Sequence, residues 1–399
     1  MEDVVSRVRV SGPLQPYAAG FAGHLAESGY LPESAAGQVR VLADLSRWLE
    51  EKGLGPQDLG EGVAAEFAAA RRAAGYRQWV SLRGLGPLLG WLRGAGAVPE
   101  PDVPLPGPAD VLLERYRCYL VAERGLADAT VRYYADGAGV FLAGREGSLA
   151  GLTGADVTAF MLAECRRRRT GSAKLLVTAL RSVLRFLAAE GLAPPGLDAA
   201  VPAVAWRRDC GLPRALPAGQ AAALLASCDR GTRGGLRDLA VLTLLSRLGL
   251  RAGEAAALEL GDIGWRSGTV TVRGKGQRDE QLPLPADAGQ ALAAWLRDGR
   301  PPGFAGRQVF TTVQAPLRGM STAAVKNAVR RACGRAGIPP AGAHRLRHTA
   351  AAGMLAAGAG LEEIGQVLRH RSAVTTAIYA KADPAALPAL AAPWPGSMP

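Results

Sequence analysis

The sequence contains little that would support disulfide or structural metal chemistry. Its 399 residues include five cysteines, an odd number, and no two of them form a C-x-x-C pair. Disulfide scaffolds and structural zinc sites need paired or closely spaced cysteines. We therefore expect neither, and we expect a protein of a reducing compartment.

Long apolar runs are also missing. The N-terminus, MEDVVSRVRV, lacks the apolar core of a signal peptide. No uninterrupted apolar run approaches the length of about 18 residues that a membrane-spanning helix requires. We therefore expect a soluble cytoplasmic protein.

Acidic residues are the scarcer charged class, and the imbalance is local. The chain has 47 Lys and Arg against 35 Asp and Glu, a net charge of +12. Residues 207–383 hold 25 Lys and Arg against 13 Asp and Glu, so the whole excess lies there. A basic segment of this kind suits a polyanion such as nucleic acid. Selection for solubility, or a coding bias toward arginine, would also raise the charge, so composition leaves both explanations open.

The first half of the chain contains an internal repeat. The segment GYLPESAAGQVRVLADLSRWL from Gly29 matches GLADATVRYYADGAGVFL from Gly125, and each begins a pattern of apolar residues at helical spacing. A final helix in each copy is expected to end at Gly96 or Gly191, followed by proline. A proline-rich linker at 99–108 separates the copies. We predict two small helical bundles.

The predicted fold is mainly α with a small β-hairpin or sheet insert. In the last domain, residues 236–250 read as a buried helix, and strands are expected at 269–273 and 281–284. The turn between the strands carries Lys275 between two glycines. A lysine at a loop tip is usually a solvated surface residue, so Lys275 gains meaning only from the residues that accompany it.

Five basic residues and a tyrosine occur in short recognisable contexts across the last third of the chain. The set is Arg251, Lys275, His344, Arg347, His370 and Tyr379. Converging cations would surround an anion, and arginine binds phosphate oxygens through paired hydrogen bonds while staying charged. The tyrosine would supply a nucleophile. This set predicts chemistry on a phosphodiester.

Several members of the set also have a plainer structural explanation. An isolated arginine such as Arg251 could cap a helix, with Glu254 one turn later pairing with its guanidinium. A tyrosine in an apolar context, such as Tyr379, is more often part of a core. His344 and His348 share a helical face and could bind zinc, but Arg345 stands where the metalloprotease pattern needs glutamate. We therefore expect no metal, and we expect His348 to be a buried structural histidine.

In this order the motifs resemble those of the tyrosine recombinase, or phage integrase, family. They are GLRAGE at 249–254, GKG at 274–276, HRLRH at 344–348 and LRHRSAVTTAIYA at 368–380. The resemblance implies a catalytic domain at 207–384, a core-binding DNA clamp at 104–200, and a diverged core-binding (SAM-like) copy at 1–103. Residues 385–399 form a tail. The family's catalytic positions map onto the six residues named above.

The resemblance implies a site-specific recombinase that needs neither a cofactor nor ATP. Tyr379 would attack the scissile phosphate and form a 3′-phosphotyrosyl link, with Lys275 as general acid. The partners would be double-stranded DNA with specific sites, and three further copies in a tetramer at the nucleoid. The candidate DNA-binding residues are Arg166, Arg167, Arg168, Arg169, Arg181, Arg369 and Arg371.

Two alternatives and three departures accompany this resemblance. A type IB topoisomerase uses the same chemistry, and a non-catalytic DNA-binding protein could retain the fold. The chain has Arg369 where the family usually has glycine, a proline-broken tail, and the extra N-terminal copy. The sequence leaves open the target site, the accessory factors, and whether the element is a phage, transposon, plasmid or chromosomal system.

Overall fold

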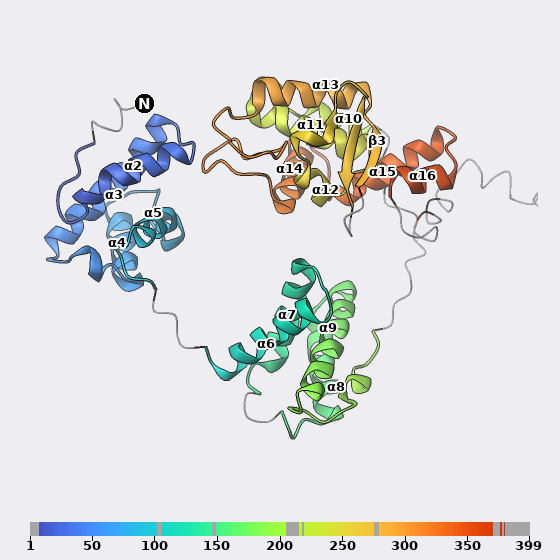
Figure 1. Cartoon of the computed structure of the whole chain (residues 1–399), viewed down its shortest axis with the longest axis horizontal. Helices are drawn as coiled ribbons and strands as arrows, with labels where there is room; N and C mark the ends of the chain where they lie inside the picture. The colour runs from blue at the N-terminus through green and yellow to red at the C-terminus, as the bar shows by residue number, and fades with distance from the viewer. Residues whose placement is uncertain are drawn as a thin grey trace, which may run out of the picture. The chain divides into compact units, whose positions relative to one another are not determined.

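The protein is described by a computed structural model, in which helices dominate (Figure 1). It describes residues 8–101, 106–145, 149–204, 215–217, 219–274, 279–369, 376 and 379. By their internal contacts, residues 1–100 and 211–399 group into one compact unit and residues 101–210 into another. Among the described residues, no helix is both long enough and apolar enough to span a bilayer.

Residues 8–101 form a helical bundle with its own core. Its helices are η1 (Gln15–Tyr17), α2 (Ala18–Glu27), α3 (Pro32–Glu51), η2 (Pro56–Asp58), α4 (Glu61–Ala73) and α5 (Leu82–Gly94). The apolar stripe predicted on α3 is buried, with Val39, Leu42 and Leu45 at most 2% exposed. Helix α5 is followed by Gly96 at φ +69°, a left-handed conformation that suits glycine and ends the helix as predicted.

Residues 106–204 form a second bundle, in which four α-helices are described, as in residues 8–101. Its described helices are α6 (Pro108–Ala122), α7 (Asp128–Leu142), α8 (Gly154–Arg167), α9 (Thr170–Ala189) and η3 (Leu197–Ala200). Gly191 follows α9 at φ +69°, as Gly96 follows α5. The core of this bundle continues through Leu197 to Val201, because η3 packs its apolar residues against α8 and α9.

The remaining described residues combine helices with a three-stranded antiparallel sheet. The helices are α10 (Gln220–Ala226), α11 (Arg233–Arg247), α12 (Ala252–Ala257), η4 (Leu260–Asp262), α13 (Ala286–Ala294), η5 (Trp295–Gly299), α14 (Thr322–Arg335), α15 (Ala343–Ala356) and α16 (Leu361–Val367). The strands are β1 (Ile263–Gly264), β2 (Thr269–Arg273) and β3 (Asp279–Pro283), in the order β1-β2-β3. This is the predicted class, mainly α with a small sheet.

The hairpin differs slightly from the expected one. Strand β3 begins two residues before the expected 281, with Arg273 opposite Asp279 and Val270 opposite Leu282. Helix α12 stops at Ala257, because Leu258 is already extended at ψ 130°. The turn residue Lys275 lies outside the described residues.

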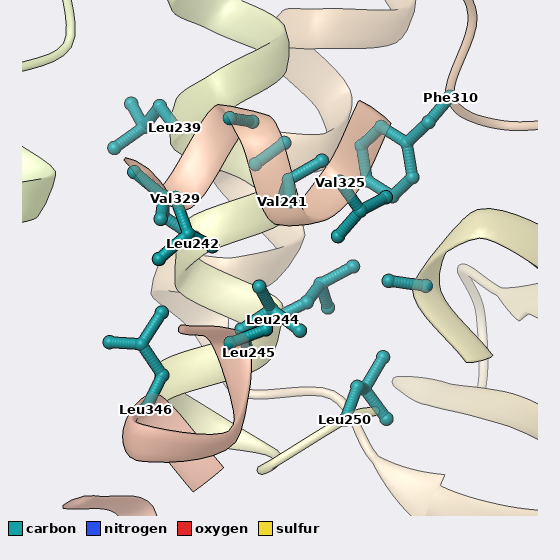
Figure 2. Packing of buried hydrophobic residues seen from close by; sticks show 14 of the residues in the cluster. Leu239, Val241, Leu242, Leu244, Leu245, Leu250, Phe310, Val325, Val329 and Leu346 are labelled. Atoms are coloured by element: carbon teal, nitrogen blue, oxygen red, sulfur yellow. The ribbon is translucent and has the colours of Figure 1, made fainter. Parts of the chain in front are cut away.

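Helix α11 is the centre of the core in this part of the protein. Figure 2 shows its side chains Leu239, Val241, Leu242, Leu244 and Leu245 among residues from several other elements. These five side chains are at most 9% exposed. A helix that is apolar on most sides is buried on most sides. Its buried C-terminal end fixes the position of Gly249 and Leu250, which lead directly into the basic site.

Candidate active site

Arg347, on helix α15, is the buried centre of the predicted basic site. It is 1% exposed, its Nη1 donates to the carbonyl oxygen of Gly249 at 2.6 Å, and its Nη2 donates to the carbonyl oxygen of Leu368. Burial, together with the neighbouring cations Arg251 and Arg369, lowers the pKa of Arg347 to about 10. The side chain therefore stays charged at neutral pH and ties together the ends of α11 and α16.

Gly249 lets the side chain of Leu368 pack closely against the backbone at this point, because glycine has no side chain. Its φ is +58°, a left-handed conformation that glycine adopts without strain. A Cβ atom built there would lie 2.5 Å from Cδ2 of Leu368. The first glycine of the GLRAGE motif thus lets Leu368 pack closely against it.

Arg251 stands at the N-cap of α12, with its side chain 46% exposed. Its Nη1 lies 2.6 Å from Oε1 of Glu254, and its backbone N–H donates to Oε2 at 2.8 Å. The pairing expected for Glu254 is therefore confirmed. It orients one edge of the Arg251 guanidinium on the protein and leaves the group partly accessible to solvent.

Glu254 has a second cationic partner in Arg369, from a distant segment. Nη2 of Arg369 lies 2.8 Å from Oε2 of Glu254, and the two side chains are 2% and 6% exposed. Burial alone would raise the pKa of Glu254, but Arg369 and the hydrogen bonds from Arg251 outweigh it and lower the pKa. The carboxylate is therefore ionised at neutral pH.

Arg369 occupies a left-handed conformation at φ +55°, where the family usually has glycine. Its Nη1 also donates to the carbonyl oxygen of Val367 at 2.7 Å. A DNA contact from Arg369 stays a prediction, but here its guanidinium serves an internal role. Sequence reasoning missed the ion pair with Glu254, because nothing in the local pattern indicates a contact across 115 residues.

The two histidines of HRLRH lie next to each other on α15. Their ring centroids are 4.4 Å apart at 71°. Partial burial lowers the pKa of His344, and Arg347 and Arg251 add to the effect. Burial, His344 and Arg347 together lower the pKa of His348 to about 4. Both rings are therefore neutral at neutral pH.

Tyr379 is 1% exposed and packs with Ala351, Ile364 and Leu368. Its hydroxyl oxygen lies 2.8 Å from Nδ1 of His348. Burial raises the pKa of Tyr379, although Arg347 acts in the opposite direction. The expected burial of His348 needs correction, because its ring is only half-buried. Its expected structural role is not contradicted, and the ring is hydrogen-bonded to the predicted nucleophile.

A cavity of about 650 Å³ opens beside the arginines. Arg251, His344 and Arg347 line it, together with Lys326 and Arg330 from α14. Sequence reasoning missed Lys326 and Arg330, whose spacing of four residues on a helix was the available signal. The described lining includes four Lys and Arg side chains and no carboxylate, so the cavity suits an anion.

The remaining predicted residues fall into two groups. Lys275, His370 and Arg371 lie outside the described residues. The others lie in the bundle of residues 106–204, where Arg166, Arg167 and Arg169 are exposed, Arg168 pairs with Glu164 at 2.7 Å, and Arg181 donates to the carbonyl oxygen of Val201 at 2.9 Å. Among the described residues, no group of three or more His, Cys, Asp or Glu side chains could hold a metal ion.

We predict that Glu254→Gln destabilises the protein by about 3 kcal/mol at neutral pH, because a buried ion pair loses one partner. The lowered pKa of Glu254 gives stability that is present above the ordinary glutamate pKa of about 4.3 and is lost as the pH falls through the folded-state pKa. The deficit relative to the wild type should therefore shrink below about pH 4. Calorimetric unfolding over this pH range measures the effect.

Glu362→Gln, at an exposed position on α16, is the matched control and should unfold like the wild type. A Glu254→Gln variant as stable as the wild type at neutral pH would contradict the role of Glu254 as the shared partner of two arginines.

Comparison with known proteins identifies relatives of this chain. The model of the "Phage integrase family" matches residues 214–386. A Sinorhizobium fredii protein described as an integrase/recombinase is 40% identical over 396 residues, covering 96% of this chain and 95% of the relative. Tyrosine recombinase XerD of Xanthomonas campestris is 33% identical over 291 residues, covering 69% of this chain and 89% of the relative.

Solved structures share the fold. XerH site-specific recombinase bound to its difH substrate matches with a TM-score of 0.55 and 18% identity, over 70% of this chain and 96% of that one. A lambda integrase dimer bound to a COC′ core site matches with a TM-score of 0.53 and 18% identity, over 66% of this chain and 96% of that one. The Sinorhizobium fredii relative matches this chain over nearly its whole length. Together these findings show that the chain belongs to the phage integrase family of tyrosine recombinases, enzymes that cut and rejoin DNA strands.

Proposed function

We propose that this recombinase cuts and rejoins specific DNA sites with Tyr379 as its nucleophile. The observation that carries the proposal is the cavity beside Arg251, His344 and Arg347, whose described lining is cationic. The Tyr379 hydroxyl is bonded to His348, which lies one turn along α15 from His344. A cation-lined cavity close to a phenol fits a phosphodiester and a group that can attack it.

The proposed reaction balances without an external energy source. The Tyr379 oxygen forms a bond to the scissile phosphorus while the bond from phosphorus to the 5′ oxygen breaks. The products are a 3′-phosphotyrosyl link and a 5′-hydroxyl, and Lys275 supplies the proton to that hydroxyl. The reverse attack, by a 5′-hydroxyl of another strand, restores Tyr379 and a phosphodiester.

The arginines would stabilise the charge that develops on the phosphate. Arg251 and Arg347 would bind the non-bridging oxygens, where negative charge increases in the transition state. His344 lines the same cavity and would orient the phosphate or transfer a proton. The roles of Lys275 and His370 rest on their sequence motifs alone.

The bundle of residues 106–204 would grip the duplex, and the assembly would be a tetramer on two sites. The exposed Arg166, Arg167 and Arg169 support the grip. A related solved structure, a lambda integrase tetramer bound to a Holliday junction, supports the assembly. The bundle of residues 8–101 would extend the DNA footprint or hold subunits together. Because the substrate is DNA, we place the activity at the nucleoid of the cytoplasm.

Tyr379→Phe should abolish the covalent protein–DNA adduct and leave duplex binding unchanged, because it removes one oxygen atom. The probe is a library of nicked duplexes with randomised sequence. Covalent adducts that survive detergent are isolated and their DNA is sequenced. The sequence shared by these adducts is the trapped site. Tyr76→Phe, at a half-exposed tyrosine distant from α15 in sequence, is the control and should form the adduct. An adduct formed by Tyr379→Phe would overturn the assignment.

Intact duplexes and a supercoiled plasmid, each carrying the trapped site, separate the recombinase from its same-chemistry alternative. Strand exchange between two duplexes that carry the trapped site supports a recombinase. Relaxation of supercoiled DNA without any exchange would instead support topoisomerase-like activity.

Replacing Arg166 and Arg169 by alanine should weaken duplex binding. Each lost phosphate contact should also reduce the slope of log affinity against log salt concentration by about 0.9. Titrations of the trapped site at several salt concentrations measure both effects. Arg117→Ala, which removes an arginine already paired with Glu114 at 3.0 Å, is the control. A salt slope unchanged by the double substitution would argue against this surface as part of the grip.

Deleting residues 1–103 should shorten the DNase footprint or weaken assembly on DNA, because this copy would contribute one or the other. Footprinting and analytical ultracentrifugation with the trapped site test the two possibilities. If the deletion changes neither result, the proposed role of the N-terminal copy is wrong.

A further inference from the structure

We propose that His348 is a positioning residue for the nucleophile, fixing the direction of the Tyr379 hydroxyl through a hydrogen bond to Nδ1. The proposal rests on the role of Tyr379 put forward above and adds a residue to it. The contact is direct, because Nδ1 of His348 and the hydroxyl oxygen of Tyr379 lie 2.8 Å apart. The histidine would carry its proton on Nε2, so that the hydroxyl donates to Nδ1.

The position of His348 on α15 connects the tyrosine to the cavity. His344, one turn earlier, lines the cavity, and the two rings are in contact at 4.4 Å between centroids. The described cavity lining includes Arg347 but neither His348 nor Tyr379. The Tyr379 hydroxyl is therefore linked to the cavity through His348 and its contact with His344.

The tyrosine ring is fixed by packing, but packing alone does not orient its polar end. Ala351, Ile364 and Leu368 surround the ring and offer only apolar side chains. A buried hydroxyl without a partner is costly, so the phenol has a strong preference for the orientation that reaches Nδ1. The hydrogen bond to Nδ1 of His348 favours this direction of the hydroxyl.

The lowered pKa of His348 makes it a weak base in this state. Burial and the neighbouring His344 and Arg347 hold the pKa of His348 at about 4, whereas burial raises the pKa of Tyr379. Transfer of the phenol proton to such a weak base is strongly unfavourable. His348 therefore contributes an acceptor in a fixed place, and the hydroxyl remains protonated until the phosphate arrives.

The test separates an acceptor from a base and from a structural ring. His348→Phe keeps the ring volume but removes the acceptor, and His348→Asn keeps an acceptor oxygen near the place of Nδ1 but cannot act as a base. The substrate is the nicked duplex that carries the trapped site. We expect His348→Phe to form the covalent adduct up to about 100-fold more slowly than the wild type in a single turnover, which is the effect of a misplaced reacting group. Affinity for the duplex should not change, because His348 does not line the cavity.

His348→Asn should recover most of the lost rate, with a pH dependence between about pH 6 and pH 8 like that of the wild type, because its acceptor does not titrate there. His24→Asn, at an exposed histidine of α2, is the matched control. If His348→Phe does not fold, as judged by its thermal midpoint, His348→Leu takes its place with the same expected rate.

Three results would overturn the proposal. One is a wild-type rate in His348→Phe or His348→Leu. Another is a rate in His348→Asn as low as in His348→Phe, which would indicate a base or a specific need for imidazole. The third is an equal loss of DNA affinity and rate. An adduct formed by Tyr379→Phe would instead refute the proposed nucleophile, so the two failures are distinguishable.

Discussion

One buried carboxylate, Glu254, holds the basic site together. Its Oε1 forms an ion pair with Nη1 of Arg251 at 2.6 Å, and its Oε2 forms another with Nη2 of Arg369 at 2.8 Å. Cations of like charge would otherwise repel each other in a region of low dielectric. Arg347 is instead stabilised by the carbonyl oxygens of Gly249 and Leu368. Three guanidinium groups and one carboxylate leave a local excess of positive charge.

That excess explains why the site suits a phosphodiester. A buried cation costs free energy unless an anion or several oxygen dipoles compensate it. Arg347 obtains part of this compensation from two carbonyls, and Arg251 from one side of Glu254. A phosphate in the cavity would supply the missing negative charge to both. Because their hydrogen bonds already fix these guanidinium groups, little reorganisation would be required when charge increases in the transition state.

The sequence predicted the parts of the site that depend on short-range patterns. The i to i+3 spacing of Arg251 and Glu254 indicated their pairing, and helical spacing put His344 and His348 on one face of α15. The apolar periodicity of α3 and α11, and the glycines after α5 and α9, likewise indicated helices that the structure contains. These signals are local, because helix geometry and glycine conformations depend on a few neighbouring residues.

The features that were missed depend on contacts between distant segments. The pair of Arg369 and Glu254 joins a turn to a helix 115 residues away, and it lets a non-glycine residue occupy a left-handed conformation that costs about 1–2 kcal/mol. Lys326 and Arg330 reach the cavity only because α14 packs against α12. The bond from Tyr379 to His348 likewise requires the fold, since 31 residues separate the two.

The charge of the cavity also bears on how the phosphate is activated. Enzymes that use divalent cations on phosphates hold the metal with carboxylates, which the described lining of this cavity does not contain. Its Lys and Arg side chains would repel a divalent cation and attract the phosphate directly. Fixed guanidinium groups can then serve the purpose that a metal serves elsewhere. Fixed positive charge would stabilise the phosphate in such a site, and the proposed attacking oxygen is the hydroxyl of Tyr379, which is hydrogen-bonded to His348.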